Sequence, residues 1–144
     1  MTCFVSQAEG RETATNPPTT TEQLLHPQKF LAGEGAKPVS APTADGKTID
    51  TGVIGEFGLG IVLEQGITDG TLSDADVKRA TEGWGGDAYV AWDQGTATCV
   101  RDRIVMDAPQ DQNELMTAFQ RFAATRRGVT VTNSGSGIVV TSCG

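Results

Sequence analysis

The stretch that decides the fold reads Gly83-Trp84-Gly85-Gly86-Asp87-Ala88-Tyr89-Val90-Ala91-Trp92-Asp93-Gln94-Gly95-Thr96-Ala97-Thr98-Cys99-Val100-Arg101-Asp102-Arg103-Ile104-Val105-Met106-Asp107. It holds both tryptophans, the only tyrosine and one of the three cysteines. Its side chains alternate over 87–93, as they do along a β-strand, with Tyr89 on one face and Trp92 on the other. The run Asp93-Gln94-Gly95 predicts a hairpin turn, so a second strand follows over about 97–106.

The second strand has one unusual position. Val100, Ile104 and Met106 share one face, and Asp102 interrupts that apolar row. The two arginines beside Asp102 point to the opposite face, because successive strand residues alternate.

The pattern after this hairpin switches from the period of a strand to that of a helix and back. The residues 109–126 predict a helix that starts at Pro109 and carries an apolar stripe including Leu115, Phe119 and Phe122. Two β-rich runs, 129–132 and 137–143, then form a second hairpin. We therefore expect an α+β fold, with hairpins 87–106 and 129–143 in one small antiparallel sheet of about four strands packed by helices.

The chain before the first hairpin predicts three further helices. A short helix is expected over residues 19–25, and Pro27 pushes His26 out of the helical region. After an extended connector over 33–50, helical spacing of Val53, Ile54, Phe57, Ile61 and Val62 predicts a helix over 51–65. A third helix is expected over 73–82, capped by Ser73. We interpret residues 1–18 as a flexible arm and 19–144 as a single domain.

Composition excludes several classes of protein. The 144 residues carry a net charge of −7, which disfavours nucleic acid and anionic membranes as partners. No apolar run is long enough to span a membrane, so no membrane span is expected. The N-terminus lacks the basic start and apolar run of a signal peptide.

The residues that could carry a reaction are few. The pattern H-E-x-x-H is absent and His26 is the only histidine, so we expect neither a catalytic metal nor a cofactor. Cys99 or Cys3 with His26 could in principle form a nucleophile and base, but a histidine before a proline more often has a structural role, here in fixing the turn.

Two sets of residues could form a site without a metal. Asp87, Asp93, Asp102 and Asp107 lie in or beside the strands, and two of them in one cleft could act as acid and base, although turn caps and solvated strand ends are the commoner use. Trp84, Tyr89 and Trp92, together with Asp87, could form an aromatic platform that binds a ligand, although aromatic side chains in a small domain more often belong to the core.

Three motifs resemble those of bacterial exported, often lipid-anchored, zinc metallopeptidase-like proteins. They are Thr19-Thr20-Thr21-Glu22-Gln23-Leu24-Leu25-His26-Pro27-Gln28-Lys29-Phe30-Leu31, then Gly55-Glu56-Phe57, then Gly83-Trp84-Gly85-Gly86-Asp87-Ala88-Tyr89, in which Ala88 replaces the usual arginine. In that group these motifs belong to the C-terminal part, and the metal-binding H-E-x-x-H helix lies upstream. The resemblance therefore implies kinship with a peptidase-like protein but supplies no active site.

Two classes of function remain open. The resemblance implies a noncatalytic accessory or binding module, with a protein or peptide as its partner, in an extracellular or cell-envelope location. The alternative is a small hydrolase that uses carboxylates or a Cys/His pair. If the export of the group holds, Cys99 and Cys143 can form a disulfide, since one begins the second strand and the other ends the fourth; two reduced cysteines in a cytosolic protein are the alternative.

Overall fold

The computed structural model describes residues 15–144, and the chain divides into two compact units, Met1–Ala36 and Lys37–Gly144. Most of the expected arm, and Cys3 with it, lies outside the described residues. The assignment of 19–144 to one domain stays a prediction. Among the residues that the structure describes, no helix combines the length and apolar character needed to cross a bilayer.

The first unit contains two short helices, α2 (Thr21–Leu25) and α3 (Pro27–Leu31). The Thr20 hydroxyl accepts a hydrogen bond from the Gln23 amide at 3.1 Å, which caps α2 as expected of a threonine at this position. His26 joins the helices through its backbone: its amide donates to the Glu22 carbonyl at 2.7 Å, and its carbonyl accepts from the Lys29 amide at 2.9 Å. Pro27 is thus the first residue of a second helix, where its fixed φ is favourable.

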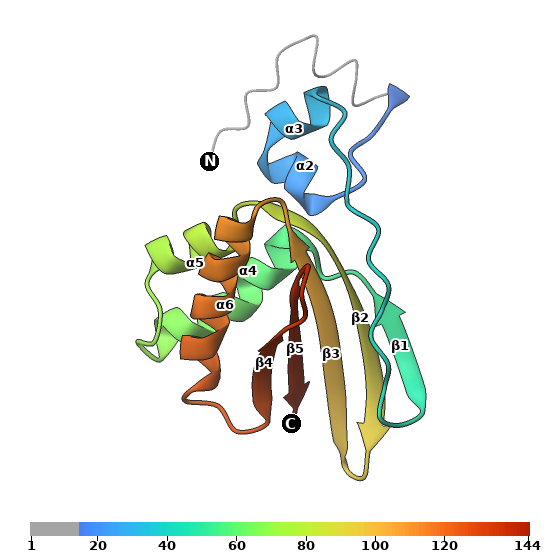
Figure 1. The fold of residues 1–144 in the computed structure, drawn as a ribbon, viewed down its shortest axis with the longest axis vertical. Coiled ribbons are helices and arrows are strands. Elements are labelled where there is room, and N and C mark those ends of the chain that lie inside the picture. Colours follow the sequence, from blue (N-terminus) through green and yellow to red (C-terminus); the bar gives the residue numbers. More distant parts are fainter. Residues whose placement is uncertain (1–14) are drawn as a thin grey trace. The chain divides into compact units, whose positions relative to one another are not determined.

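The second unit is an α+β fold, as expected, built on a five-stranded antiparallel sheet in the order β1-β2-β3-β5-β4 (Figure 1). The two expected hairpins are β2 (Trp84–Gln94) with β3 (Ala97–Met106), and β4 (Val129–Asn133) with β5 (Ile138–Cys143). They meet where β3 pairs with β5. The sheet exceeds the expected four strands by β1 (Thr48–Gly52), which pairs with β2 at the edge.

Three helices lie on one face of this sheet: α4 (Gly55–Thr68), α5 (Asp74–Thr81) and α6 (Pro109–Ala123) (Figure 1). The expected stripe of α6 is confirmed, because Leu115, Phe119 and Phe122 are 0%, 2% and 6% exposed. They pack with Ile104 of β3 and other apolar side chains in the main core. Burial of such a stripe supplies most of the stability of a helix of this length.

The helix expected over 51–65 is present, but the prediction is wrong in its start. Residues up to Gly52 form β1, and the helix begins at Gly55. Leu59 and Leu63 face the core, whereas Phe57 and Ile61, two of the residues whose spacing predicted the helix, are 56% and 48% exposed. The apolar residues occur around the whole helix, so their spacing alone could not identify the face that the sheet covers.

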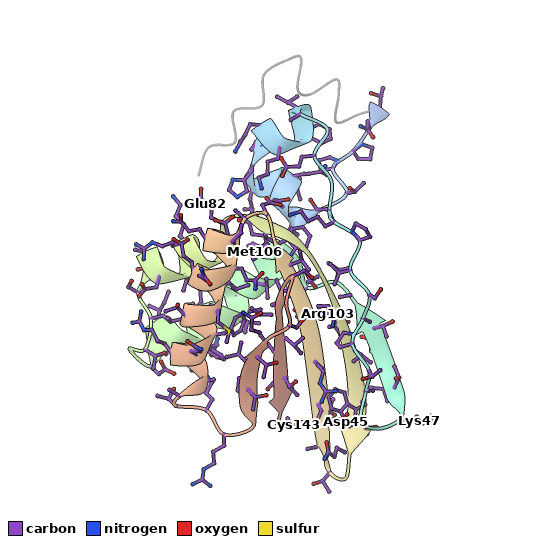
Figure 2. The ribbon with its side chains drawn as sticks, in the orientation of Figure 1. Asp45, Lys47, Glu82, Arg103, Met106 and Cys143 are labelled. Atoms are coloured by element: carbon purple, nitrogen blue, oxygen red, sulfur yellow. A yellow bond between two sulfur atoms is a disulfide. The ribbon has the colours of Figure 1, made fainter. Side chains whose placement is uncertain are left out.

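The opposite face of the sheet is covered by the connector before β1. The Lys37 amide donates to the Gly85 carbonyl at 2.6 Å, and Gly86 permits this close approach, because an added β-carbon would lie 2.5 Å from the Lys37 carbonyl oxygen. Further along, Arg101 donates to the Thr43 carbonyl at 2.6 Å and pairs with Asp45. Figure 2 labels Asp45, the connector residue of this ion pair, and Arg103, which lies two residues further along β3.

A disulfide joins Cys99 of β3 to Cys143 of β5, which are directly paired in the sheet register. The pairing expected from the resemblance and from the strand positions is therefore present in the structure. Figure 2 shows Cys143 at the end of the last strand. The cross-link spans a sequence separation of 44 and pins the C-terminal strand to the middle of the sheet.

We predict that the double variant Cys99→Ala/Cys143→Ala loses roughly 4 kcal/mol of unfolding free energy, because a loop of this length is no longer constrained in the unfolded chain. Urea unfolding with and without reductant measures the loss. Reductant should lower the stability of the native protein and leave the double variant unchanged. Free thiols at both positions in protein made under oxidising conditions would contradict the cross-link.

Candidate ligand-binding site

A cavity of about 380 Å³ opens between the helices and the sheet of the second unit. Its size falls in the range of about 300–1,000 Å³ that is typical of small-molecule sites. Apolar side chains from several elements line it, and the polar contributions come from Asp102, Arg126 and Ser142. The apolar residues are Ile54, Leu59, Val62, Val100, Ile104, Phe119, Phe122, Val129 and Val140.

Asp102 is the polar group buried in the wall of this cavity. It lies on the helix-facing side of β3, paired with Tyr89 of β2 and Val140 of β5, and is only 4% exposed. Within residues 15–144, no group donates a hydrogen bond to either of its carboxyl oxygens. This is the side chain that interrupts the apolar row of β3, and a buried polar group without a donor is costly.

Asp87, on the neighbouring strand β2, is also buried, but its carboxylate has hydrogen-bond donors. Its carboxylate accepts hydrogen bonds from the Ile54 amide at 2.7 Å, the Gly55 amide at 2.8 Å and the indole Nε1 of Trp84 at 2.9 Å. Gly55 reaches this geometry with a φ of 75°, which other residues rarely adopt. The carboxylate thus caps the positive end of α4 from a different part of the chain.

The surroundings raise the pKa of Asp102 to about 8, first by burial and then by the negative charge of the nearby Asp87. At this pKa the Asp102 carboxyl group is mainly protonated at neutral pH, and its carbonyl oxygen remains an acceptor in the cavity wall.

Arg126 places a cation at the cavity, but its charge is balanced. Its guanidinium pairs with Asp69 at 2.7 Å and donates to the Phe122 carbonyl at 3.0 Å. It also stacks 3.7 Å above the Phe122 ring, a cation–π arrangement. Arg126 is thereby fixed as part of the wall.

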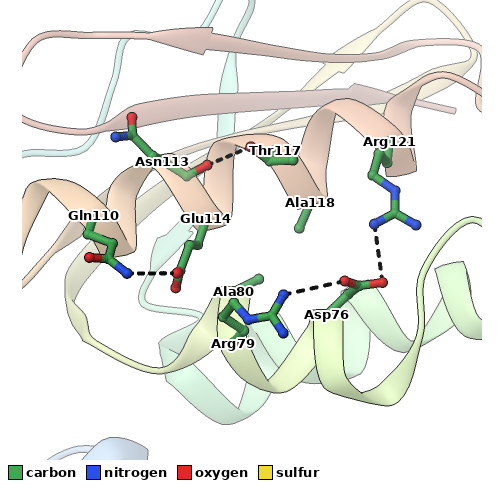
Figure 3. A pocket seen from close by; sticks show the side chains of 9 residues that line it. All are labelled: Asp76, Arg79, Ala80, Gln110, Asn113, Glu114, Thr117, Ala118 and Arg121. Carbon is green, nitrogen blue, oxygen red and sulfur yellow. Dashed lines mark hydrogen bonds and ion pairs between the residues drawn. The ribbon is translucent and has the colours of Figure 1, made fainter.

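A second depression, about 270 Å³, lies between α5 and α6, and most of its lining residues are of polar or charged types (Figure 3). Its charged groups pair with one another: Asp76 contacts Arg121 at 3.1 Å and Arg79 at 3.8 Å. Hydrogen bonds from Ser73, with the charge of Arg121, lower the pKa of Asp76. This surface already satisfies its own charges, so it favours a helix–helix contact over a binding site.

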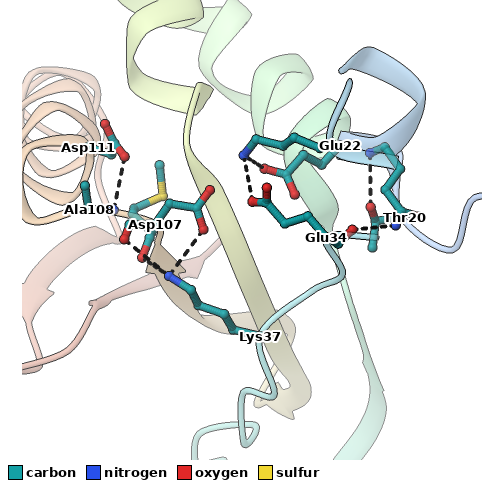
Figure 4. A network of polar contacts seen from close by, with 10 residues as sticks. Thr20, Glu22, Glu34, Lys37, Asp107, Ala108 and Asp111 are labelled. Carbon is teal, nitrogen blue, oxygen red and sulfur yellow. Dashed lines mark hydrogen bonds and ion pairs between the residues drawn. The ribbon is translucent and has the colours of Figure 1, made fainter. Parts of the chain in front are cut away.

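A third depression follows the end of β3. Close to it, the Lys37 ammonium pairs with the Asp107 carboxylate at 3.2 Å, and the Ala108 amide donates to Asp111 at 3.1 Å (Figure 4). These contacts anchor the connector and cap α6. The polar groups beside this depression therefore have a structural role.

The structure separates the aromatic residues expected to form a platform. Trp84 is buried in the main core on the helix side, while Trp92 is buried on the opposite face under Arg101, whose guanidinium lies 4.9 Å from the Trp92 ring. Tyr89 donates its hydroxyl to Asp50 at 2.7 Å. Each of the three thus has a different structural setting, and a shared ligand-binding role for them stays a prediction.

Of the four strand aspartates, the fold brings Asp87 and Asp102 together. Asp93 and Asp107 are exposed and lie outside the cavity lining. The signal that pointed to Asp102 was its place in an otherwise apolar row. The apolar patterns of the two helices marked Phe119, Phe122 and Val62, but no sequence signal indicated that these side chains line a cavity.

The fold is a small α+β domain with an apolar cavity between its helices and its sheet. The chain belongs to the family described as a domain of unknown function (DUF8575), which matches residues 41–142. The matched span lies inside the second unit and contains every residue that lines the cavity. No curated protein and no solved structure matches the chain.

We predict that Asp102→Asn removes a pH dependence of stability. Unfolded aspartate has a pKa of 3.8 and native Asp102 one of about 8, so between these values the native state binds one more proton. Stability of the native protein should therefore fall as pH rises through this window, by up to about 1.4 kcal/mol per pH unit, and level off above it. Urea unfolding across the window measures the slope.

The difference between the native protein and Asp102→Asn isolates this one group. The amide of the Asp102→Asn variant cannot ionise, so the variant should be the more stable protein at the alkaline end. Asp93→Asn, at an exposed position of β2, is the control and should keep the native slope. Parallel pH profiles for the native protein and Asp102→Asn would show that Asp102 is ionised throughout.

We also predict that Asp87→Ala destabilises the domain by on the order of 3 kcal/mol, because two amides at the start of α4 and the Trp84 indole lose their buried acceptor. Thermal and urea unfolding measure the loss. Asp74→Ala, in the exposed first turn of α5, is the matched control and should cost much less. Equal losses in the two variants would contradict the role of Asp87.

Proposed function

We propose that the chain is a noncatalytic binding module, and that the cavity at Asp102 is its ligand site. The observation that carries this proposal is an apolar cavity of about 380 Å³ with one unsatisfied buried carboxyl group in its wall. Ligand sites commonly combine apolar walls with a few polar groups that orient the ligand. The ligand is an apolar molecule, or an apolar group of a larger one.

The contacts of the potential reactive groups support binding over catalysis. Asp87 accepts hydrogen bonds from two amides at the start of α4 and from the Trp84 indole, so its carboxylate has a structural role. Cys99 and Cys143 share a disulfide, which leaves neither of them as a thiol nucleophile. A hydrolase would need a nucleophile or an activated water beside Asp102, and the cavity wall around this residue is mainly apolar.

A hydrolase that uses carboxylates is the second candidate, because Asp87 and Asp102 interact and one of them is held protonated. Paired carboxyl groups with separated protonation can serve as acid and base. Peptidase and esterase assays with and without a chelator distinguish the candidates. Chelator-resistant turnover that Asp102→Asn abolishes, with the fold intact, would favour the hydrolase.

The relation to exported metallopeptidase-like proteins stays a proposal that rests on the three motifs. In this view the chain is an accessory module of such a protein, located outside the cell or in the cell envelope, with a protein or peptide among its partners. The disulfide supports this location, since such bonds persist in oxidising compartments. The net charge of −7 argues against nucleic acid as a partner.

We predict that phenylnaphthylamine, a neutral dye that fluoresces in apolar surroundings, binds saturably to the native protein. Val140→Trp should weaken binding about tenfold or more, because an indole at this position fills the cavity. Val139→Trp is the matched control, since Val139 is the neighbouring residue on the opposite face of β5. Fluorescence titration measures the affinities.

Circular dichroism should show the same fold in both tryptophan variants. Native affinity in Val140→Trp would place the dye elsewhere on the protein. Absence of saturable binding to the native protein would reject the cavity as a ligand site.

A further inference from the structure

We propose that the cavity binds a primary amine with an apolar tail, whose ammonium head pairs with the carboxyl group of Asp102. This inference rests on the proposed binding function and names its ligand class. The tail would lie against the apolar side chains of α4 and α6 that line the cavity.

The first reason is the missing hydrogen-bond donor. Asp102 is 4% exposed, and within residues 15–144 neither of its oxygens receives a hydrogen bond. A ligand that donates hydrogen bonds at this point would remove the cost of that burial. An ammonium group has three donors and no acceptor, so it suits a wall that presents carboxyl oxygens.

The second reason is the balance of charge around Asp102. Asp87 on β2 adds a negative charge next to it, and Arg126 after α6 is neutralised by Asp69. The charged groups that line the cavity are Asp102 and Arg126, whereas Glu56 of α4 is outside the lining. The negative charge near the two aspartates would repel an anionic head group. The same charge attracts a cationic head group.

The remaining polar neighbours fit the same ligand. Tyr89 is opposite Asp102 in the register of β2, but its hydroxyl already donates to Asp50. Ser142 of β5 lines the cavity and offers a hydroxyl oxygen as a further acceptor. The net charge of −7 also attracts cations to the protein from solution.

Binding has a defined proton balance. The ammonium ligand enters with its own proton, and Asp102 passes from carboxylic acid to carboxylate as the ion pair forms. One proton therefore leaves to the solvent for each ligand bound at neutral pH. Affinity should rise about tenfold per pH unit below the pKa of Asp102 and become constant above it.

The test compares three ligands with the same tail: octylammonium, octanol and octanoate. Each competes with phenylnaphthylamine for the native protein, and calorimetry in two buffers of different ionisation enthalpy counts the protons released. We expect octylammonium to bind at least about tenfold more tightly than the other two, with release of about one proton near pH 7. Asp102→Asn should lose this preference and the proton release, which direct calorimetric titration of the variant measures, and its circular dichroism spectrum should match that of the native protein.

The outcomes separate this inference from the function on which it rests. Equal affinity for octylammonium and octanol, with dye binding intact, would overturn the amine and leave the binding module standing. A preference for octylammonium that survives Asp102→Asn would also overturn it. Failure of the dye and of all three ligands to bind would reject both proposals.

Discussion

The structure of the second unit depends on the carboxylate of Asp87. Three donors converge on it, two from the start of α4 and one from the Trp84 indole. The contact joins the long hairpin to a helix that lies more than 30 residues earlier in the chain. Because an acceptor of this kind also stabilises the positive end of the helix dipole, it fixes where α4 begins and how it crosses the sheet.

The position of α4 in turn creates the environment of Asp102. With Asp87 occupied by its donors, the next aspartate on the same face of the sheet has no donor of its own and remains protonated at neutral pH. The helices enclose an apolar space next to it. A neutral carboxylic acid at the wall of such a space can exchange its proton for a cationic ligand, which links the stability of the fold to the chemistry of the site.

Local patterns in the sequence predicted the two hairpins, the α6 helix with its buried Phe119 and Phe122, and the disulfide. They missed β1, whose residues are mostly exposed at the edge of the sheet and lack an apolar alternation. They also gave no buried face for α4, since its apolar residues occur around the whole helix and tertiary packing decides which of them are buried. Asp87 was predicted to be a ligand residue. Its contact with α4 joins residues far apart in the chain, so patterns within a short segment could not predict it. Asp102 was noticed as an interruption, while its cavity depends on several separate elements.

The most direct measurement is the titration of the Asp102 side chain by NMR of its carboxyl carbon, in the native protein and with octylammonium present. We expect a free-protein midpoint at about 8, because burial and Asp87 oppose ionisation. Saturating octylammonium should shift this midpoint downward, since the ammonium group stabilises the carboxylate. A midpoint near the ordinary aspartate value in the free protein, or one that octylammonium leaves unchanged, would contradict the account.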